Sequence, residues 1–203
     1  MFLKRSVDIL LSALIVLLLS PVFAAVALAV WLESGSPVMF RQVRIGRGFC
    51  RFGILKFRTM RVDAVGPLVT VGGDRRITRV GRILRLTKLD ELPQLWNVLL
   101  GEMSMVGPRP EVPEYVELFR DRYRTILAVR PGITDLASIY YRNEEAILAQ
   151  SRDPLHEYSN RILPIKLELA DRYIRERSFL RDVAIIARTV IVTLRPNRVS
   201  TKA

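Results

Sequence analysis

Two adjacent carboxylates, Asp90 and Glu91, interrupt a leucine-rich stretch, "LTKLDELPQLWNVLL", in a chain that is otherwise strongly basic. A carboxylate held among cations can stay ionised, bind Mg²⁺ together with phosphate oxygens, or attack phosphorus. Acidic residues are also common in the first turn of a helix, because the helix dipole favours negative charge there. The pair therefore marks either a helix start or part of a phosphate site.

Two arginines stand in proline-containing turns further along the chain. Arg109 lies between two prolines in "VGPRP", and Arg130 precedes a Pro-Gly turn in "VRPGIT". Proline fixes φ and so limits how the guanidinium can be aimed, and the planar guanidinium suits phosphate oxygens. An arginine on a Pro-rich connection is common, but two such turns beside an acid pair favour a phosphate site.

The stretch that ends with the acid pair, residues 75–91, has a basic residue at every third position from Arg76 to Lys88 and apolar residues between them. This pattern is typical of a helix at an anionic membrane surface, and equally of the solvated face of a core helix. We expect the next helix to begin near Thr87, with Pro93 in its first turn. Spacing predicts one buried stripe for that helix, made of Leu89, Leu92, Trp96 and Leu99.

Composition narrows the class of partner and of metal. The 203 residues include 32 Lys and Arg against 20 Asp and Glu, a net charge of +12, and half of the residues are hydrophobic. Such a charge implies an anionic partner, such as nucleic acid, acidic lipid or a phosphorylated substrate. Cys50 is the single cysteine and His156 the single histidine, so no internal disulfide and no Cys/His metal site can form. Any metal would be a hard, oxygen-bound ion.

An uncharged apolar run from Ile9 to Leu32 predicts membrane attachment. As a helix it would be about 36 Å long, enough for a hydrocarbon core of about 30 Å and too long for a signal-peptide core. Ser20 and Pro21 lie at its middle, where proline breaks the helical hydrogen bonding. Basic residues flank both ends, so a helix that enters, bends and returns would satisfy the positive-inside rule. A kinked helix that spans the membrane stays open.

The remaining pattern predicts an α+β fold that is mostly helical. The segment "SGSP" separates a membrane helix, residues 1–35, from a second domain, residues 36–203. Residues 38–60 indicate a β-hairpin with glycines at its turn, and residues 61–74 a loop. Two helices close the chain, the first with Pro164 near its start and the second capped by Ser178. We expect short strands together with amphipathic helices at the membrane interface.

Three segments in this order carry a resemblance: "KFRTM" (56–60), "LDELPQLWNVLLGEMSMVGPRP" (89–110) and "VRPGIT" (129–134). Behind a hydrophobic N-terminal segment, they resemble the bacterial sugar transferase family, and within it the monotopic polyprenyl-phosphate phosphoglycosyl transferases. The resemblance implies transfer of a sugar 1-phosphate from a UDP-sugar to undecaprenyl phosphate, with release of UMP, as the first membrane step of bacterial glycan assembly. It also implies Mg²⁺ as cofactor and a re-entrant helix, broken at Ser20-Pro21, on the cytoplasmic face of the bacterial inner membrane.

The same resemblance assigns roles to residues. Asp90 would be the nucleophile that forms an aspartyl-phosphosugar intermediate and contacts Mg²⁺, and Glu91 would assist in metal and proton handling. Some relatives have lysine where this chain has Arg58. The residues expected to bind phosphate or substrate are Arg109, Arg85, Arg58, Lys56 and Arg130.

One departure and several alternatives remain. After "PGIT" many relatives continue with Gly-Trp, whereas this chain has Asp135-Leu136, and the sequence does not predict the effect. Membrane lipids are expected partners, and a homodimer is left open. A membrane-anchored nucleic-acid-binding protein would explain the charge, but no recognition motif is present, and we expect no nucleic acid. A non-catalytic scaffold would leave the acid pair and Arg109 without a purpose. Neither the UDP-sugar nor the glycan pathway follows from the sequence.

Overall fold

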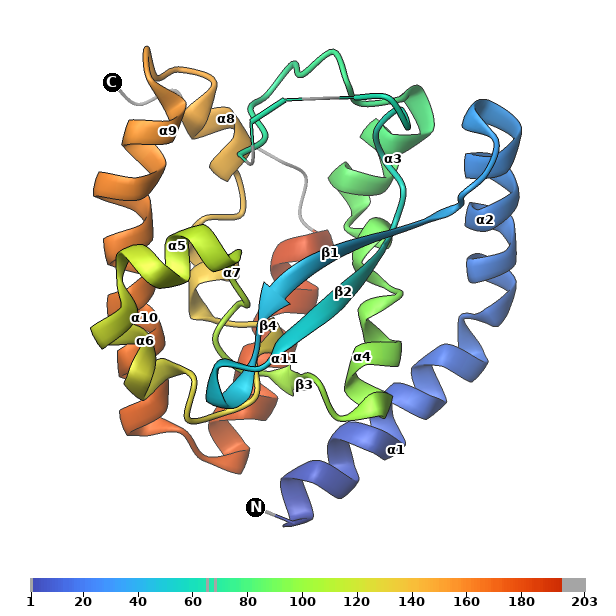
Figure 1. The fold of residues 1–203 in the computed structure, drawn as a ribbon. Helices are drawn as coiled ribbons and strands as arrows, with labels where there is room; N and C mark the ends of the chain where they lie inside the picture. Colours follow the sequence, from blue (N-terminus) through green and yellow to red (C-terminus); the bar gives the residue numbers. More distant parts are fainter. Residues whose placement is uncertain (1, 65, 68, 195–203) are drawn as a thin grey trace.

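The computed structural model describes residues 2–64, 66–67 and 69–194 of the chain. Within these residues the protein is mostly helical and contains two small sheets of two strands each (Figure 1). This confirms the expected α+β class with a helical majority.

The apolar N-terminal segment forms two helices that meet at a bend. Helix α1 (Phe2–Leu18) and helix α2 (Ser20–Ser34) are inclined by 63°. The Ser20 hydroxyl donates to the carbonyl of Leu17 at 2.8 Å, and Pro21 lies in the first turn of α2, where its missing N–H leaves no helical bond unmet. No single helix among the described residues has the length and composition to cross a membrane, whereas this bent pair does when both halves are taken together.

Polar side chains fasten the beginning of α1 to the rest of the protein. Arg5 donates to two carbonyls in the last turn of helix α4 (Gln94–Leu100). Asp8 is buried and accepts a hydrogen bond of 2.7 Å from the Ser104 hydroxyl, at the start of strand β3 (Ser104–Val106). Arg5, one of the basic residues expected before the apolar run, therefore lies inside α1 and binds α4.

The predicted hairpin is confirmed. Strands β1 (Met39–Ile45) and β2 (Arg51–Phe57) pair antiparallel along their full length. Their connection is the short 3₁₀ turn η1 (Arg47–Phe49), in which Gly48 has φ 66°. That left-handed value favours glycine, because a side chain would clash with the backbone. In Figure 1 the hairpin crosses the molecule between the α1–α2 pair and the helices of the opposite side.

The basic stretch forms a shorter helix than its pattern suggests, α3 (Arg79–Thr87). The Thr78 hydroxyl caps its start by accepting a 2.9 Å hydrogen bond from the Gly81 N–H. The expectation that the next helix begins near Thr87 is wrong. Thr87 is the last residue of α3, and its hydroxyl donates back to the Ile83 carbonyl at 2.8 Å.

The later start of α4 changes which side chains are buried. This helix begins after Pro93, so its buried face consists of Gln94, Leu95, Asn97 and Val98. Trp96, which was expected in the buried stripe, is 42% exposed, and Leu89, Leu92 and Leu99 are only partly buried. The predicted stripe is wrong because it continued one helical register across the break at Pro93.

A second sheet brings the two proline-containing turns together. Strand β3 pairs parallel with strand β4 (Gly132–Thr134). The N–H of Gly107 donates to the Thr134 carbonyl at 3.1 Å, and the N–H of Gly132 donates to the Pro108 carbonyl at 3.0 Å. A Cβ on Gly132 would lie 2.1 Å from the nitrogen of Gly107, so only glycine permits this approach. The motifs "VGPRP" and "RPGIT" are thus packed against each other.

The remaining helices surround this sheet, and α10 packs against α6 and α7. Pro164 lies in the first turn of α10, and the Ser178 hydroxyl accepts from the Arg181 N–H at the start of α11, which confirms both expected helix starts. These elements are α5 (Pro113–Leu118), α6 (Arg120–Ile126), α7 (Leu136–Tyr140), α8 (Glu144–Leu148), α9 (Pro154–Glu157), the π-helical turn η3 (Tyr158–Ile162), α10 (Leu163–Glu176) and α11 (Phe179–Leu194).

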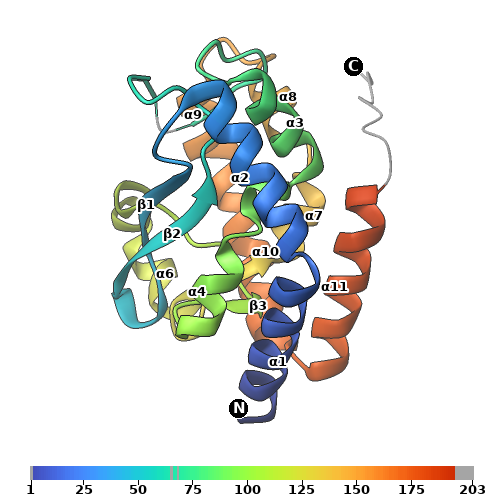
Figure 2. The ribbon, with the colours of Figure 1, turned by 90° about the vertical axis from the view of Figure 1, so that its right-hand side faces the viewer.

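Large apolar side chains are exposed on several helices of one side of the molecule. Figure 2 shows α1 and α2 at the front of that side, between α4 and α11, with α3 above. Scattered exposed leucines are normal, but a group shared by neighbouring helices indicates an apolar contact surface. We call it the apolar face, and its exposed residues include Leu10, Leu14, Leu17, Leu28, Leu32, Ile83, Leu86, Leu100, Leu180 and Val183.

Candidate active site

The acid pair lies in a tight turn between two helices. Lys88 has φ 60° and ψ 15°, a left-handed conformation that ends α3 and redirects the chain. The 3₁₀ turn η2 (Leu89–Glu91) follows directly and carries both acids. Asp90 and Glu91 therefore precede α4 but do not form its first turn, which weakens the explanation of the pair as a helix-start feature.

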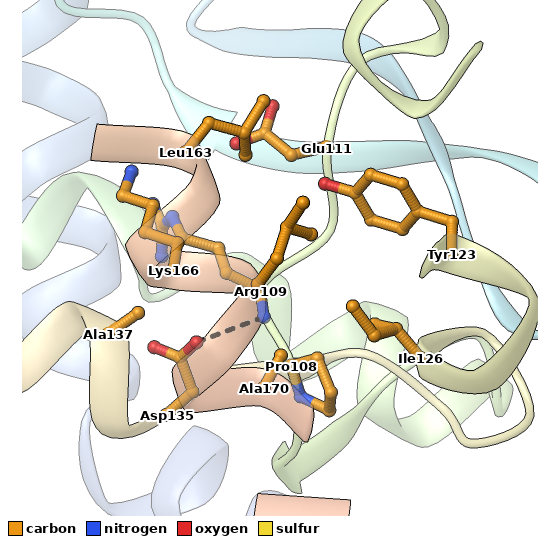
Figure 3. Close-up of a pocket in the computed structure, with 11 residues that line it drawn as sticks. Pro108, Arg109, Glu111, Tyr123, Ile126, Asp135, Ala137, Leu163, Lys166 and Ala170 are labelled. Atoms are coloured by element: carbon orange, nitrogen blue, oxygen red, sulfur yellow. Dashed lines mark hydrogen bonds between the residues drawn. The ribbon is translucent and has the colours of Figure 1, made fainter. Parts of the chain in front are cut away.

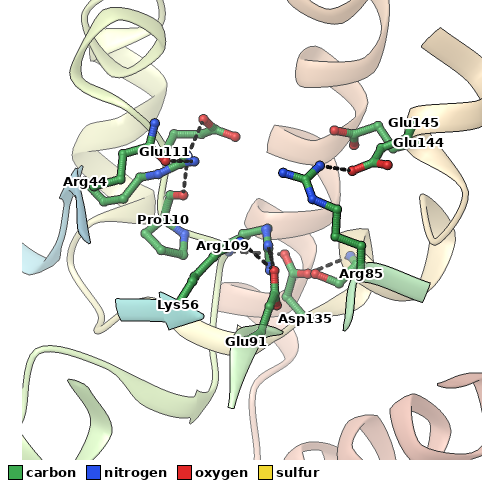
Figure 4. A network of polar contacts seen from close by, with 12 residues as sticks. Arg44, Lys56, Arg85, Glu91, Arg109, Pro110, Glu111, Asp135, Glu144 and Glu145 are labelled. Carbon is green, nitrogen blue, oxygen red and sulfur yellow. Dashed lines mark hydrogen bonds and ion pairs between the residues drawn. The ribbon is translucent and has the colours of Figure 1, made fainter. Parts of the chain in front are cut away.

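Glu91 is held by two cations from different parts of the chain (Figure 4). The ammonium of Lys56, on β2, donates to Glu91 Oε1 at 2.8 Å. The Arg109 guanidinium donates to both carboxylate oxygens, with Nη1 3.3 Å from Oε2 and Nη2 bonded to Oε1. Burial alone would raise the pKa of Glu91, but Arg109 and Lys56 outweigh it and hold that pKa well below its usual value. Glu91 is thus a fully paired, ionised carboxylate.

Asp90 is in the opposite situation although it is the neighbouring residue. Its side chain is only 6% exposed, and Oδ1 is buried without a hydrogen-bond partner among the described residues. Burial raises the pKa of Asp90, the Glu91 charge raises it further, and Lys56 acts against both. A buried carboxylate oxygen with no partner costs free energy unless a ligand satisfies it. Asp90 is the group in this turn that is left available for chemistry.

The pKa values of the two cations that hold Glu91 are themselves shifted by its charge. Burial lowers the pKa of Lys56, and Glu91 partly restores it. Glu91 raises the pKa of Arg109. Both cations remain near the acid pair, so the site combines one paired carboxylate, one unpaired carboxylate and two positive charges.

Arg85 lies close enough to influence Asp90 but is bound elsewhere. Its Nε donates to the Thr59 hydroxyl at 2.9 Å, and its Nη1 donates to Glu145 of α8 at 2.8 Å. The positive charge of Arg85 lowers the pKa of Asp90, which places it within electrostatic range. Because the Glu145 side chain is 45% exposed, this ion pair is accessible to solvent and a phosphate can compete for the arginine.

Arg58 and Arg130, which were also expected to bind phosphate, donate hydrogen bonds to backbone carbonyls in the structure. Arg58 is buried, and its Nη2 donates to the carbonyls of Ser34 and Gly35 at the end of α2, while Nε and Nη1 have no partner in the described part of the chain. Arg130 donates from Nε to the Gly101 carbonyl after α4, at 2.7 Å. Burial, with the neighbouring Arg5 and Arg47, lowers the pKa of Arg130. The phosphate-binding role of both arginines stays a prediction.

Sequence patterns did not single out two amides in α4. Gln94, four residues after Asp90, is completely buried, and neither its Oε1 nor its Nε2 has a partner among the described residues. Asn97 joins α4 to β2, since its side chain accepts from the Leu55 N–H at 3.0 Å and donates to the Gly53 carbonyl at 2.9 Å. The signal for both was a polar residue on the buried face of a helix, which only the later start of α4 reveals.

The acid pair offers few free oxygen ligands for a metal ion. Among residues 2–64, 66–67 and 69–194, no three or more His, Cys, Asp or Glu side chains gather as a cation site. Mg²⁺ is commonly bound by one or two carboxylates, with water and substrate phosphates supplying the other oxygens. The buried, unpartnered Oδ1 of Asp90 fits such a site, whereas Glu91 already uses both of its oxygens.

A second buried cluster lies behind Arg109. A small cavity of about 20 Å³, roughly the size of one water molecule, lies there. Figure 3 shows Arg109, Asp135 and Lys166 among the residues that line it. Glu111 also lines it and accepts hydrogen bonds from Arg44 at 3.2 Å and from the Tyr158 hydroxyl. This cavity is too small for a nucleotide.

The sequence of the whole chain is similar to a known protein family. A family model described as "Bacterial sugar transferase" matches residues 1–196. The chain belongs to the bacterial sugar transferase family. It is 42% identical over 193 residues to the UDP-glucose:undecaprenyl-phosphate glucose-1-phosphate transferase of Caulobacter vibrioides, covering 92% of this chain and 68% of that protein.

Two further sugar transferases show the same range of identity. The chain is 40% identical to the UDP-N-acetylgalactosamine-undecaprenyl-phosphate N-acetylgalactosaminephosphotransferase of Aeromonas hydrophila, over 93% of this chain and 43% of that protein. It is 43% identical to the UDP-glucose:undecaprenyl-phosphate glucose-1-phosphate transferase of Escherichia coli, over 93% of this chain and 39% of that protein. The chain thus spans less than half the length of these two sugar transferases.

Proposed function

We propose that this bacterial sugar transferase moves a sugar 1-phosphate from a UDP-sugar to undecaprenyl phosphate and releases UMP. The observation that carries the proposal is the contrast within the acid pair: Asp90 is buried and unpartnered, and Glu91 is held by Lys56 and Arg109. Relatives at about 40% identity are named for this reaction with glucose or N-acetylgalactosamine donors. The sugar used by this chain is left to experiment.

The reaction proceeds in two displacements at one phosphorus atom. A carboxylate oxygen of Asp90 attacks the β-phosphorus of the UDP-sugar, the bond from that phosphorus to the bridging oxygen breaks, and UMP leaves with the bond electrons. An oxygen of undecaprenyl phosphate then attacks the same phosphorus, and the aspartyl–phosphorus bond breaks to restore the Asp90 carboxylate. The covalent step lets one site serve a water-soluble donor and a lipid acceptor in turn.

The surrounding charges suit this chemistry. Phosphoryl transfer between anions needs positive charge near the phosphate oxygens, because little else lowers the barrier. Arg109 and Lys56 supply that charge beside Asp90, and Glu91 fixes both cations in place. Mg²⁺, when bound, would neutralise phosphate charge, and Asp90 is the residue that would hold it.

The apolar face accounts for access to a lipid acceptor. We propose that the bent α1–α2 pair enters the cytoplasmic leaflet of the bacterial inner membrane and returns to the same side, with a break at Ser20-Pro21. Helix α3 exposes Ile83 and Leu86 together with arginines, as expected of a helix at an anionic lipid surface. The acid pair follows α3 directly, so this placement would bring Asp90 near the depth of the lipid phosphate.

The test is UMP release by the protein in nanodiscs, given Mg²⁺, undecaprenyl phosphate and a panel of UDP-sugars. We expect release with one or a few donors, dependent on the lipid for multiple turnovers and lost in Asp90→Asn. Glu111→Gln is the matched control, because it also neutralises a buried carboxylate, in this case one paired with Arg44, but leaves the acid pair intact. Full activity of Asp90→Asn would refute the nucleophile, and a folded protein that turns over no donor would favour the scaffold alternative.

A further inference from the structure

We propose that Asp135 is a positioning residue that fixes the Arg109 turn for binding the donor's phosphates, an inference that rests on the function proposed above. Asp135 is the first residue after β4 and is only 4% exposed. Its carboxylate accepts hydrogen bonds from Arg109 and Ser138, so its influence on the acid pair would pass through Arg109.

The topology places Asp135 beside Arg109. The parallel pairing of β3 with β4 aligns Val106 with Thr134, so the residues that leave the two strands run side by side. The crossed hydrogen bonds of Gly107 and Gly132 hold the two turns in contact at this point. A side chain at position 135 is therefore brought to the backbone of position 109 by the sheet itself.

The two carboxylate oxygens of Asp135 have different partners, of which Figure 3 shows the Arg109 N–H. Oδ1 accepts a 2.6 Å hydrogen bond from the Ser138 N–H and so caps helix α7. Oδ2 accepts a 3.2 Å hydrogen bond from the Arg109 N–H. Capping α7 fixes the carboxylate in one orientation, and the second oxygen is then presented to Arg109.

The Arg109 N–H is a special donor because of its neighbours. Pro108 and Pro110 have no N–H, so within this tripeptide Arg109 provides the single backbone donor. The two prolines are held through their carbonyls, by the Gly132 N–H at 3.0 Å and by Arg44 at 3.2 Å. Asp135 completes this set by fixing the residue whose side chain binds Glu91.

A negative charge at this position also favours the site electrostatically. Asp135, after Glu91, contributes to the raised pKa of Arg109. It therefore balances part of the positive charge of Arg109 without occupying the guanidinium nitrogens, which stay directed to Glu91. An uncharged residue that only capped α7 would supply neither the second hydrogen bond nor this charge.

Three variants separate the capping role from the positioning role. Asp135→Ser keeps a hydroxyl that can cap α7, and Asp135→Asn keeps one acceptor oxygen, but neither can accept from both N–H groups with a charged carboxylate. Asp153→Asn is the matched control, because Asp153 caps α9 in the same way, through the His156 N–H at 3.1 Å, on a helix that does not carry the Arg109 turn.

The readout is steady-state kinetics in nanodiscs, with the donor and the lipid varied separately. We expect the KM for the UDP-sugar to rise roughly tenfold in both Asp135 variants, because a misplaced guanidinium weakens donor binding. The KM for undecaprenyl phosphate should change less than about twofold, and Asp153→Asn should behave like the unmodified chain.

A double-mutant cycle with Arg109→Ala decides whether the effect passes through Arg109. We expect Asp135→Asn to add less than about twofold once Arg109 is absent. Independent, multiplicative effects of the two substitutions, or an equal loss for both substrates that follows a lower melting temperature, would overturn the inference. Activity of the unmodified chain with no change in Asp135→Asn would overturn the inference alone, whereas inactivity of the unmodified chain with every donor would overturn the proposed function and this inference together.

Discussion

The acid pair and the cluster around Glu111 are both buried, but among the described residues only the acid pair contains a carboxylate oxygen without a partner. In the Glu111 cluster, the carboxylate accepts from Arg44, from the Tyr158 hydroxyl and from its neighbour's N–H at 3.1 Å. Burial alone would raise the pKa of Glu111, but Arg44 and Lys166 lower it below the usual value. In the acid pair, Glu91 is satisfied in the same way, but Asp90 keeps a buried oxygen without a partner.

This difference indicates that Asp90 is the buried acid available for chemistry. A paired acid such as Glu111 or Glu91 gains its stability from fixed partners and has no free oxygen to offer a substrate. Asp90 has a raised pKa and an open oxygen, the condition expected of a group that meets its partner only when substrate binds. Asp90→Asn should therefore lower turnover by about a thousandfold or more, a loss measured as UMP release, because an amide oxygen is a poor nucleophile. Equal losses in Asp90→Asn and Glu111→Gln would erase the distinction between the clusters.

Substituting the two arginines of the proline-containing turns, Arg109 and Arg130, should give the next largest difference in activity. Arg109→Ala should lower kcat/KM for the donor by about a hundredfold, because it removes a charge beside the acid pair and frees Glu91. Arg130→Ala is the matched control, since Arg130 donates to the Gly101 carbonyl instead of the acid pair, and we expect a loss below about fivefold. A large, donor-specific loss in Arg130→Ala with normal stability would show that Arg130 binds phosphate, as the sequence predicted.

The pH dependence should report the raised pKa of Asp90. Only the ionised carboxylate can attack phosphorus, so kcat/KM should fall as the pH drops below that pKa, at a higher pH than for an ordinary aspartate. Lys56→Met removes a charge that lowers this pKa, and the acid limb of the profile should then move to still higher pH. An acid limb that moves to lower pH in Lys56→Met would contradict this assignment.

The Glu111 cluster should respond in stability more than in chemistry. Glu111→Gln should lower the free energy of unfolding by about 2 kcal/mol at pH 7, because it neutralises one side of a buried ion pair. Since the folded-state pKa of Glu111 is depressed, its contribution is full above the unfolded-state pKa and is lost as the pH falls towards the folded-state value. The gap between the two proteins in urea unfolding should therefore narrow on acidification, and a constant gap would argue against the ion pair as its cause.

The smallest expected effect concerns the unpartnered amide of Gln94. Gln94→Met keeps the shape of the side chain and removes two buried polar atoms, so it should raise the free energy of unfolding by about 1 kcal/mol. If the amide also meets the substrate, turnover should fall in the same variant, as in other sites where activity costs stability. Lower stability in Gln94→Met would mean that the amide has a structural partner instead.

Local sequence patterns predicted the hairpin, the starts of the last two helices and the break at Ser20-Pro21 because each depends on residues close together in the chain. They failed at Thr87, where a lysine in a left-handed conformation ends one helix and shifts the start of the next. Backbone dihedrals of this kind in a non-glycine residue leave no sequence signal. The buried stripe of α4 was consequently assigned to the wrong face.

Contacts between distant segments explain the rest of the difference. The acid pair, Arg109 and Lys56 were predicted as site residues, but the contact of Lys56 with Glu91 depends on how β2 lies against η2. Arg109 and Arg130 have similar sequence settings, and the parallel pairing of β3 with β4 turns one guanidinium to Glu91 and the other to the end of α4. The contact of Asp135 with the Arg109 N–H follows from the same pairing and could not be predicted from the sequence.

Covalent attachment of the sugar phosphate to Asp90 is the decisive step of the proposed mechanism, and intact-protein mass spectrometry can detect it. The protein would be incubated with Mg²⁺ and its UDP-sugar without undecaprenyl phosphate, then mapped by peptide fragmentation. We expect one added sugar phosphate on the peptide that contains Asp90, released as lipid-linked sugar when undecaprenyl phosphate is added, and no adduct in Asp90→Asn. Turnover with no adduct under any quench, or an adduct on another residue, would contradict the account.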